Sequence, residues 1–221
     1  MFKKVLVAED FDSINIAVLQ ALGELSVPLF DHAKYCDDAL LKIKKAQFDQ
    51  APYDLLISDL SFLADGREIE LQSGEELIAA VRKVQPDIAV IVLSVEDKPF
   101  KIRQLFDQFN VSGYVFKGRS SIQQLMQAIK IVFDGGEYLS PELIHVRNGK
   151  SLDEIDSYDI SLLKLLAKGF NQKEIAKKFS ETGISPHSVS AVEKKISRLK
   201  IYFQANNNVQ IVAMAKDLGF I

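Results

Sequence analysis

The chain has 221 residues, of which 48% are hydrophobic and 26% are charged, a balance that is ordinary for globular protein and argues against extended disorder. Its single cysteine, Cys36, excludes an internal disulfide bond and fits a reducing compartment. No apolar run approaches the roughly 18 residues that a membrane span needs, and the first run is too short for a signal peptide. The sequence therefore predicts a cytoplasmic protein with no membrane partner.

The formal net charge of −3 is divided unevenly along the chain. Residues 151–221 carry 10 Lys or Arg against 8 Asp or Glu, whereas residues 1–150 carry the remaining 17 against 22. The mildly basic C-terminal part is therefore the candidate nucleic-acid binder, although a difference this small also arises by chance.

The first 134 residues alternate short apolar runs with stretches of helical periodicity. The apolar runs predict five strands, at residues 2–8, 28–30, 55–57, 88–93 and 113–116. Helical spacing follows each run, at residues 13–25, 39–46, 74–84, 99–109 and 122–133. Five such units predict an α/β fold: a five-stranded, doubly wound, flavodoxin-like parallel sheet with helices on both faces.

The remainder of the chain carries no strand signal after residue 156. Residues 135–156 contain Pro141 and several turn-forming residues, and they predict a linker that holds a short helical piece. Four helices are expected beyond it: one that Gly169 closes, and three at residues 172–179, 187–200 and 209–217. Two short helices joined by a turn, the second rich in Ser and Lys, predict a small all-α helix-turn-helix domain at residues 157–221.

Polar side chains stand at the carboxyl ends of the predicted strands, where open α/β sheets build their sites. These side chains are Glu9, Asp10, Asp59, Ser94 and Lys117. Three carboxylates at one sheet edge need a cation, and oxygen-only ligands favour Mg²⁺. A lysine and a hydroxyl beside them would bind an anion, so the set predicts a phosphoryl-transfer site with Asp59 as its nucleophile.

Each of these residues also has a simpler structural explanation. Glu9 and Asp10 suit the N-terminus of the first helix, where the helix dipole favours acidic side chains, and Ser94 suits a helix cap. Tyr114, on the fifth strand, suits the core with its hydroxyl at the surface. Lys117 alone suits a solvated surface charge. Only their joint occurrence, in order, favours a site.

In this order and spacing, these residues resemble the receiver domain of bacterial two-component response regulators. The matching features are Glu9-Asp10 after the first strand, Asp59 after the third, Ser94 after the fourth, and Tyr114-Val115-Phe116-Lys117 on the fifth. The resemblance covers residues 1–134. It implies that a sensor histidine kinase phosphorylates Asp59, with Lys117 and Ser94 on the phosphoryl oxygens and Tyr114 as a rotameric switch. The Mg²⁺ ligands that it implies are Asp10, Asp59 and the backbone carbonyl of Ser61, with Glu9 acting partly through water.

The C-terminal part is similar to the LuxR-type helix-turn-helix domain of the NarL/FixJ class. The resemblance is carried by Leu162-Leu163-x-Leu165-Leu166-Ala167-x-Gly169, Asn171-Gln172-Lys173-Glu174-Ile175-Ala176 and Ile184-Ser185-x-x-Ser188-Val189. It implies a transcription regulator that binds promoter DNA as a homodimer once phosphorylated. Lysines are expected on phosphates and serines nearer the bases. The residues expected at the DNA are His187, Ser188, Ser190, Lys194, Lys195, Arg198 and Lys200.

The final helix, 209–217, is expected to pair two such domains. Its apolar positions available for a partner are Ile211, Val212, Met214 and Ala215.

The sequence departs from the family pattern in ways that leave alternatives open. Val95 follows Ser94 where the family usually has a smaller residue, and the loop from Asp59 to Gly74 is longer than usual. An atypical regulator that is controlled by protein contacts, with little phosphorylation, is therefore a second hypothesis. Ser190 and Val192 stand where the family often has Lys and His, which leaves a protein-binding helical bundle as another.

A phosphatase with Asp59 as nucleophile is the remaining alternative. Such enzymes commonly need a second acid two residues further on, and that position is Ser61. The chain is therefore not expected to be an enzyme.

Overall fold

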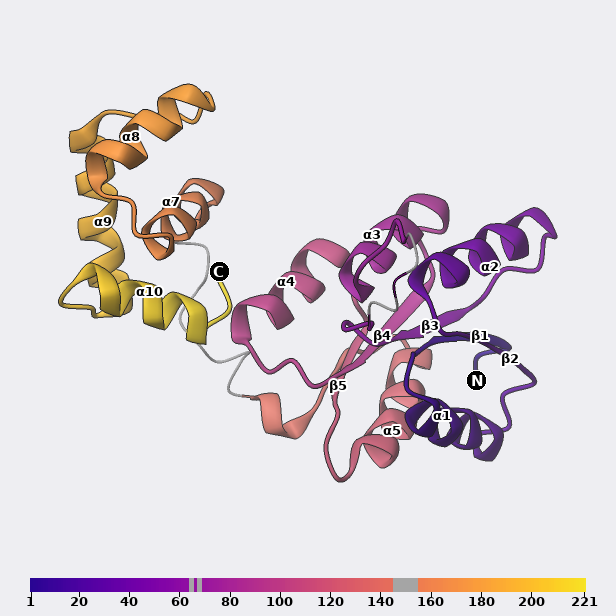
Figure 1. The fold of residues 1–221 in the computed structure, drawn as a ribbon. Helices are drawn as coiled ribbons and strands as arrows, with labels where there is room; N and C mark the ends of the chain where they lie inside the picture. The colour runs from indigo at the N-terminus through magenta and orange to yellow at the C-terminus, as the bar shows by residue number, and fades with distance from the viewer. Residues whose placement is uncertain (64–65, 67–68, 145–154) are drawn as a thin grey trace. The chain divides into compact units, whose positions relative to one another are not determined.

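The computed structural model describes residues 1–63, 66, 69–144 and 155–221. These residues form two compact units, one built on a sheet and one entirely helical (Figure 1). None of the helices in the described part of the chain combines the length and the apolar character that crossing a membrane requires.

The first unit is built on a parallel sheet with the strand order β2-β1-β3-β4-β5-β6. Its strands are β1 (Lys4–Ala8), β2 (Leu29–Ala33), β3 (Leu55–Ser58), β4 (Ala89–Ser94), β5 (Gly113–Phe116) and β6 (Tyr138–Leu139). Every neighbouring pair is parallel. The predicted doubly wound α/β fold is confirmed, and the sheet has one strand more than the five that were predicted.

Helices cover both faces of this sheet (Figure 1). They are α1 (Asp12–Glu24), α2 (Cys36–Phe48), α3 (Gly74–Val84), α4 (Pro99–Phe109) and α5 (Ser121–Phe133). Successive side chains of a strand point to opposite faces of the sheet, so one strand contributes residues to the core on each face. In β1, Val5 and Val7 pack on the side of α1 and α5, whereas Leu6 packs on the side of α2, α3 and α4. Burial on both faces explains why the strands are continuous apolar runs.

The sixth strand lies in the segment that was predicted to be a linker. The N–H of Tyr138 donates to the carbonyl of Ser112 at 3.1 Å, and the N–H of Ser140 donates to the carbonyl of Tyr114 at 3.0 Å. A single 3₁₀ turn, η1 (Pro141–Leu143), follows. Two residues are too few to show a periodicity, which is why the sequence did not indicate this strand. Residues 145–154 of the predicted linker lie outside the described part of the chain.

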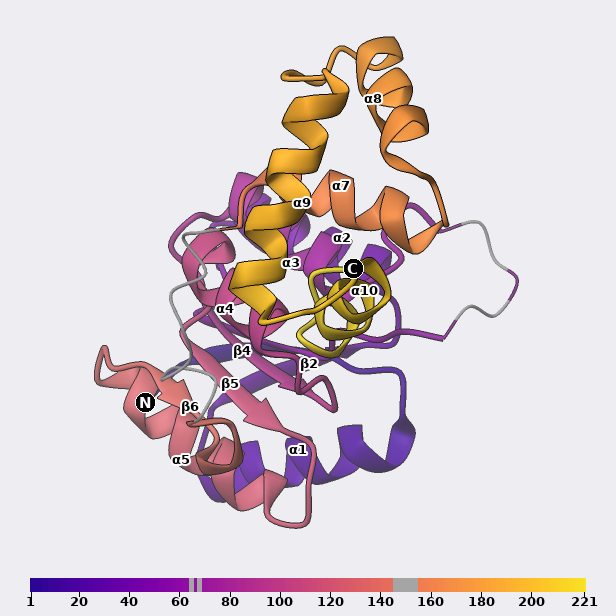
Figure 2. The ribbon, with the colours of Figure 1, turned by 90° about the vertical axis from the view of Figure 1, so that its left-hand side faces the viewer.

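The second unit contains α7 (Ser157–Ala167), α8 (Gln172–Glu181), α9 (Val189–Phe203) and α10 (Asn208–Asp217). Figure 2 shows α9 running along this unit, with α8 at one end and α10 at the other. The Asn171–Glu174 stretch of the predicted motif forms a capping box at the start of α8, because each side chain binds the other residue's backbone N–H. The four predicted helices are all present, and α9 starts and ends later than predicted.

Helix α10 uses its apolar face within its own unit. Ile211 and Ala215 are fully buried in the core of the second unit, so the prediction that they are available to a partner is wrong. Residues four apart share one face of a helix, and in α10 that face covers the other helices. Val209 is 80% exposed and is the large apolar side chain that α10 leaves in solvent.

Candidate functional site

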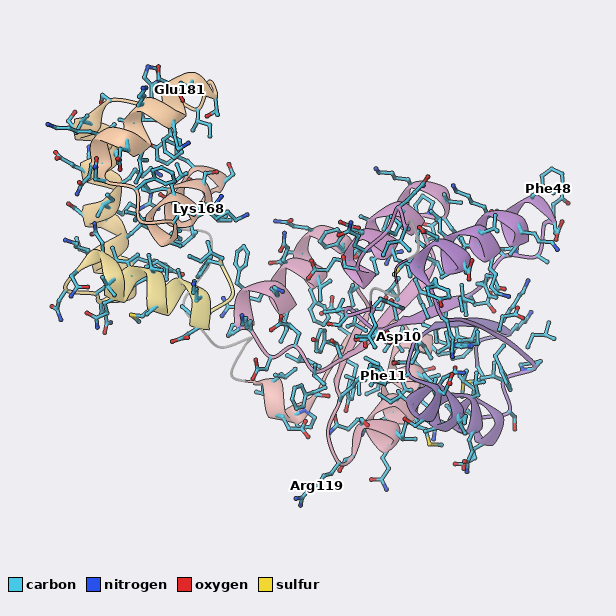
Figure 3. All side chains as sticks on the ribbon, in the orientation of Figure 1. Asp10, Phe11, Phe48, Arg119, Lys168 and Glu181 are labelled. Carbon is cyan, nitrogen blue, oxygen red and sulfur yellow. The ribbon has the colours of Figure 1, made fainter. Side chains whose placement is uncertain are left out.

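The register of the sheet brings the predicted site residues to one edge. Ala8 and Ser58 are partners across β1 and β3, so the residues that follow them, Glu9 and Asp59, begin neighbouring loops. The N–H of Asp59 donates to the carbonyl of Ala8 at 3.0 Å. Figure 3 labels Asp10, the next residue, at the same edge of the sheet.

Lys117 joins two carboxylates at this edge. Its ammonium nitrogen lies 2.8 Å from Glu9 Oε2 and 2.6 Å from Asp59 Oδ2. Glu9 and Asp59 are buried, and only 10% of the Lys117 side chain is exposed. In such a setting an ion pair is weakly screened by water. The lysine is therefore a fixed cation between two acids rather than a solvated surface charge.

Glu9 is held from several directions. Burial raises the pKa of its carboxyl, and the ammonium of Lys117 acts against that rise. Its Oε1 accepts a hydrogen bond from the N–H of Phe11 at 3.2 Å. The imidazole Nε2 of His32 lies 2.8 Å from the backbone carbonyl oxygen of Glu9. These contacts fix Glu9 both through its carboxylate and through its backbone carbonyl.

One carboxylate oxygen of Asp10 accepts a hydrogen bond, and the other has no partner in the described part of the chain. Its Oδ2 accepts a hydrogen bond from the N–H of Leu63 at 2.8 Å. Its Oδ1 is buried and finds no hydrogen-bond partner in the described part of the chain. Ligand atoms of Glu9, Asp10 and Asp59 lie within 4.8 Å of one another, and one ammonium does not balance three carboxylates. An orphaned carboxylate oxygen inside an oxygen-only cluster fits a hard divalent cation.

Asp59 is fixed through its backbone as well as its side chain. Its Oδ1 accepts a hydrogen bond from the N–H of Leu60 at 2.6 Å. The first residue of α3, Gly74, lies against its main chain: a Cβ at position 74 would be 1.8 Å from the carbonyl oxygen of Asp59. No side chain fits there. This role of Gly74 was missed, because the sequence shows a helix start but not what lies beside it.

Ser94 and Tyr114 lie inside the protein. The Tyr114 hydroxyl donates to the carbonyl of Glu96 at 2.7 Å, and burial raises its pKa. Both Ser94 and Tyr114 have no exposed surface, so a tyrosine with its hydroxyl at the surface is excluded. Val95, by contrast, is 62% exposed. The tyrosine hydroxyl thus rests on the loop that follows Ser94.

The long loop after Asp59 is tied down at both described ends. Ser61 forms an isolated antiparallel bridge with Ser73. The carboxylate of Asp37 accepts one hydrogen bond from the N–H of Glu70 and one from the N–H of Leu71, both at 3.0 Å. Extra length in this loop is therefore compatible with a fixed position for Ser61, whose carbonyl was predicted to bind the cation.

Most of the residues predicted to contact DNA lie at the start of α9 or on an exposed side of it, whereas Lys195 and Lys200 are half-buried. His187, Ser188 and Ser190 are exposed at its N-terminus, and Lys194 and Arg198 are exposed further along. The Ser188 side chain caps α9 by accepting a hydrogen bond from the N–H of Ala191 at 3.2 Å. The helix start therefore presents hydroxyl groups to solvent from a fixed turn.

Lys195 differs from the other cations of α9 because its ammonium is bound inside the second unit. It lies 2.8 Å from Asp156 Oδ2 and 3.1 Å from Asp159 Oδ1, and 5.2 Å from the centre of the Tyr158 ring. Asp159 is fully buried, and it forms a capping box with Asp156 at the start of α7. The lysine thus ties α9 to α7, and a DNA phosphate would have to compete with two carboxylates for it.

Comparison with known proteins gives relatives over the whole chain, although no family model matches it. The chain is 25% identical to response regulator GacA of Pseudomonas aeruginosa, over 99% of this chain and 97% of that protein. It is 34% identical to the transcriptional regulatory protein UhpA of Escherichia coli, over 53% of this chain and 56% of that protein. The fold matches Salmonella typhimurium response regulator RcsB with a TM-score of 0.67 and 18% identity, over 96% and 98% of the two chains. An RcsB structure bound to a promoter in the presence of the phosphomimetic BeF₃⁻ matches with a TM-score of 0.61, also at 18% identity, over 98% of each chain.

Proposed function

We propose that this chain, which belongs to the NarL/FixJ class of response regulators, controls transcription from promoter DNA according to the phosphorylation of Asp59 by a sensor histidine kinase. The first unit, including β6 and η1, is the receiver domain in this proposal, and residues 157–221 are the DNA-binding domain. The observation that carries it is the Lys117 ammonium, held by Glu9 and Asp59 beside an orphaned Asp10 oxygen. Promoter binding requires the protein to work in the cytoplasm.

The acidic cluster is the proposed Mg²⁺ site. Asp10 and Asp59 would hold the ion directly together with the backbone carbonyl of Ser61, and Glu9 would act partly through water. When bound, the ion supplies positive charge that offsets the carboxylates and the oxygens of an incoming phosphoryl group.

The residues of the chain have separate roles in phosphoryl transfer. A carboxylate oxygen of Asp59 forms a bond to phosphorus while the bond from phosphorus to the kinase's imidazole nitrogen breaks, and that nitrogen keeps the electron pair. The Lys117 ammonium moves from the carboxylate to a phosphoryl oxygen, and the Ser94 hydroxyl donates to another. As Ser94 moves toward the phosphoryl group, Tyr114 leaves its place on the loop and changes the surface around α4 and α5.

Asp59 is expected to be the residue that takes up phosphate. Incubation with acetyl phosphate and Mg²⁺ should add one phosphoryl group to the wild-type protein, as seen by intact mass spectrometry. The addition should disappear in Asp59→Asn and when the divalent ion is chelated. Asp49→Asn, a change at an exposed aspartate at the end of α2, is the matched control and should leave uptake unchanged. A phosphoryl group that persists in Asp59→Asn would refute the assignment.

The proposed DNA interface is the exposed side of α9. Lys194 and Arg198 on that side would neutralise phosphates, and so would the half-buried Lys200 near the end of the helix. His187, Ser188 and Ser190 would lie nearer the bases. We leave Lys195 out of the proposed interface, because Asp156 and Asp159 already bind its ammonium. The protein would act as a homodimer when phosphorylated, since two linked domains bind a two-fold site more tightly than one.

Lys194→Ala is expected to weaken DNA binding alike for all sequences. Each phosphate contact contributes about 0.9 to the slope of log affinity against log salt, so the slope should flatten by about that amount. Fluorescence anisotropy with a duplex that wild-type protein selects from a random pool measures the slope. Lys216→Ala, at an exposed position of α10, is the control and should leave it unchanged. An unchanged slope for Lys194→Ala would remove this side of α9 from the interface.

A further inference from the structure

A buried serine fixes the segment that follows β6. Ser140 has no exposed surface. Its hydroxyl accepts a hydrogen bond from the N–H of Phe116 at 2.9 Å and donates to Oε1 of Gln124 on α5. The amide nitrogen of Gln124 donates in turn to the carboxylate of Glu142, at 2.8 and 3.1 Å from its two oxygens. We call Ser140, Gln124 and Glu142 the clasp.

The clasp meets the candidate site at the end of β5. Successive backbone N–H groups of a strand point toward its two neighbours in the sheet, and at the end of β5 the N–H groups on both sides donate hydrogen bonds. The N–H of Lys117 points toward β4 and donates to the carbonyl of Ser94 at 2.8 Å. The N–H of Phe116 points the other way and donates to Ser140. The strand end that carries the Lys117 ammonium is therefore held between Ser94 on one side and Ser140 on the other.

The hydroxyl of Ser140 takes the place of a backbone hydrogen-bond acceptor for the N–H of Phe116. β6 ends at Leu139, and the chain turns into η1, so the next rung of the sheet has no backbone acceptor from β6. A buried N–H without a partner is costly, and the serine side chain supplies the missing acceptor. The clasp therefore lies close to the end of the described part of the first unit, next to Leu143 of η1, which is buried in the core of that unit.

We propose that Ser140 is a positioning residue that transmits the state of the Lys117–Asp59 pair to the segment leading to the helix-turn-helix domain. The inference rests on the proposed function, because phosphorylation of Asp59 is its input and DNA binding is its output. When Lys117 moves onto a phosphoryl oxygen, the end of β5 adjusts, and the hydrogen bond from Phe116 to Ser140 adjusts with it. Gln124 and Glu142 then carry the change to η1.

The test is a cycle of four affinities in the full-length protein. Wild type and Ser140→Ala are each titrated with a duplex selected from a random pool by the wild-type protein, with and without beryllofluoride. The ratio of the two affinities should fall about 3- to 30-fold in Ser140→Ala. Phosphate uptake from acetyl phosphate, measured by mass spectrometry, should stay within about twofold of wild type. A serine with only a structural role would lower thermal stability in both states and leave the ratio unchanged.

Two further variants keep the test decisive if Ser140→Ala does not fold. Gln124→Ala leaves the bond between Phe116 and Ser140 but breaks the link to Glu142, so it should also lower the ratio. Gln127→Ala, at an exposed position of the same helix, should not. An unchanged ratio in Gln124→Ala, and in Ser140→Ala where that variant folds, would overturn the inference alone. A wild-type protein whose affinity ignores beryllofluoride would overturn the proposed function together with it.

Discussion

Replacing Gly74 by alanine is expected to lower the free energy of unfolding of the first unit by about 3 kcal/mol, the upper range for overpacking a rigid site. The added Cβ would lie 1.8 Å from the carbonyl oxygen of Asp59 and 2.9 Å from the Cα of Leu60. Both atoms belong to the backbone and cannot turn aside as a flexible side chain does. Relief therefore requires either α3 or the β3 strand end to move, and the strand end carries the proposed nucleophile.

The same displacement should slow phosphate uptake. Misplacing a reacting group by about 1 Å lowers the rate on the order of 100-fold, so the rate of phosphate uptake from acetyl phosphate should fall about 100-fold. Urea unfolding and intact mass spectrometry measure the two effects. Gly23→Ala is the matched control, because nothing lies within 4 Å of its added Cβ in α1. That change should raise stability by about 0.5–1 kcal/mol. A Gly74→Ala protein with the stability and the uptake of wild type would show that the site tolerates the shift.

The sheet and the composition of the candidate site were predictable because both depend on local pattern. A strand buried on two faces is a short apolar run, and Leu55 to Ile57 is one that leads through Ser58 to Asp59. Parallel strands place their carboxyl ends at one edge, so Glu9 and Lys117 had to approach Asp59 once the strands were assigned. Their actual pairing through one ammonium follows from the register of β1, β3, β4 and β5.

Features that depend on packing were not predictable in the same way. Helical spacing gives α10 an apolar face, but it does not show that Ile211 and Ala215 on that face pack into the core of their own unit. The clasp at Ser140 depends on a two-residue strand that has no periodicity. Lys195 looks like a DNA contact in a basic helix, and only the fold shows that residues 156 and 159 lie beside it. An Asp-x-x-Asp pattern before an apolar run indicates a cap, but not the cation that it binds.

Lys195→Met is expected to destabilise the second unit by about 3–5 kcal/mol at neutral pH, because it leaves a buried carboxylate without its partner. Asp159 is fully buried, and Lys195 is the cation that the structure pairs with it. Methionine keeps most of the apolar stem over the Tyr158 ring, so the change removes the charge more than the packing. Urea unfolding, followed by a probe in the second unit, measures the difference.

The destabilisation by Lys195→Met should also depend on pH in a defined direction. Burial raises the pKa of Asp159, and without the opposing effect of the Lys195 ammonium it should rise further. A carboxyl whose folded-state pKa is raised contributes stability below its unfolded value of about 3.9, and that stability is lost as the pH rises through the folded value. The deficit against wild type should therefore be small near pH 4 and grow toward pH 7. Lys177→Met is the control: its pair with Glu181 is 3.9 Å long and exposed, so it should change stability by less than about 0.5 kcal/mol at any pH. A Lys195→Met deficit that is equally small across this range would mean that the ammonium is dispensable to the fold, and would return Lys195 to the candidates for phosphate contact.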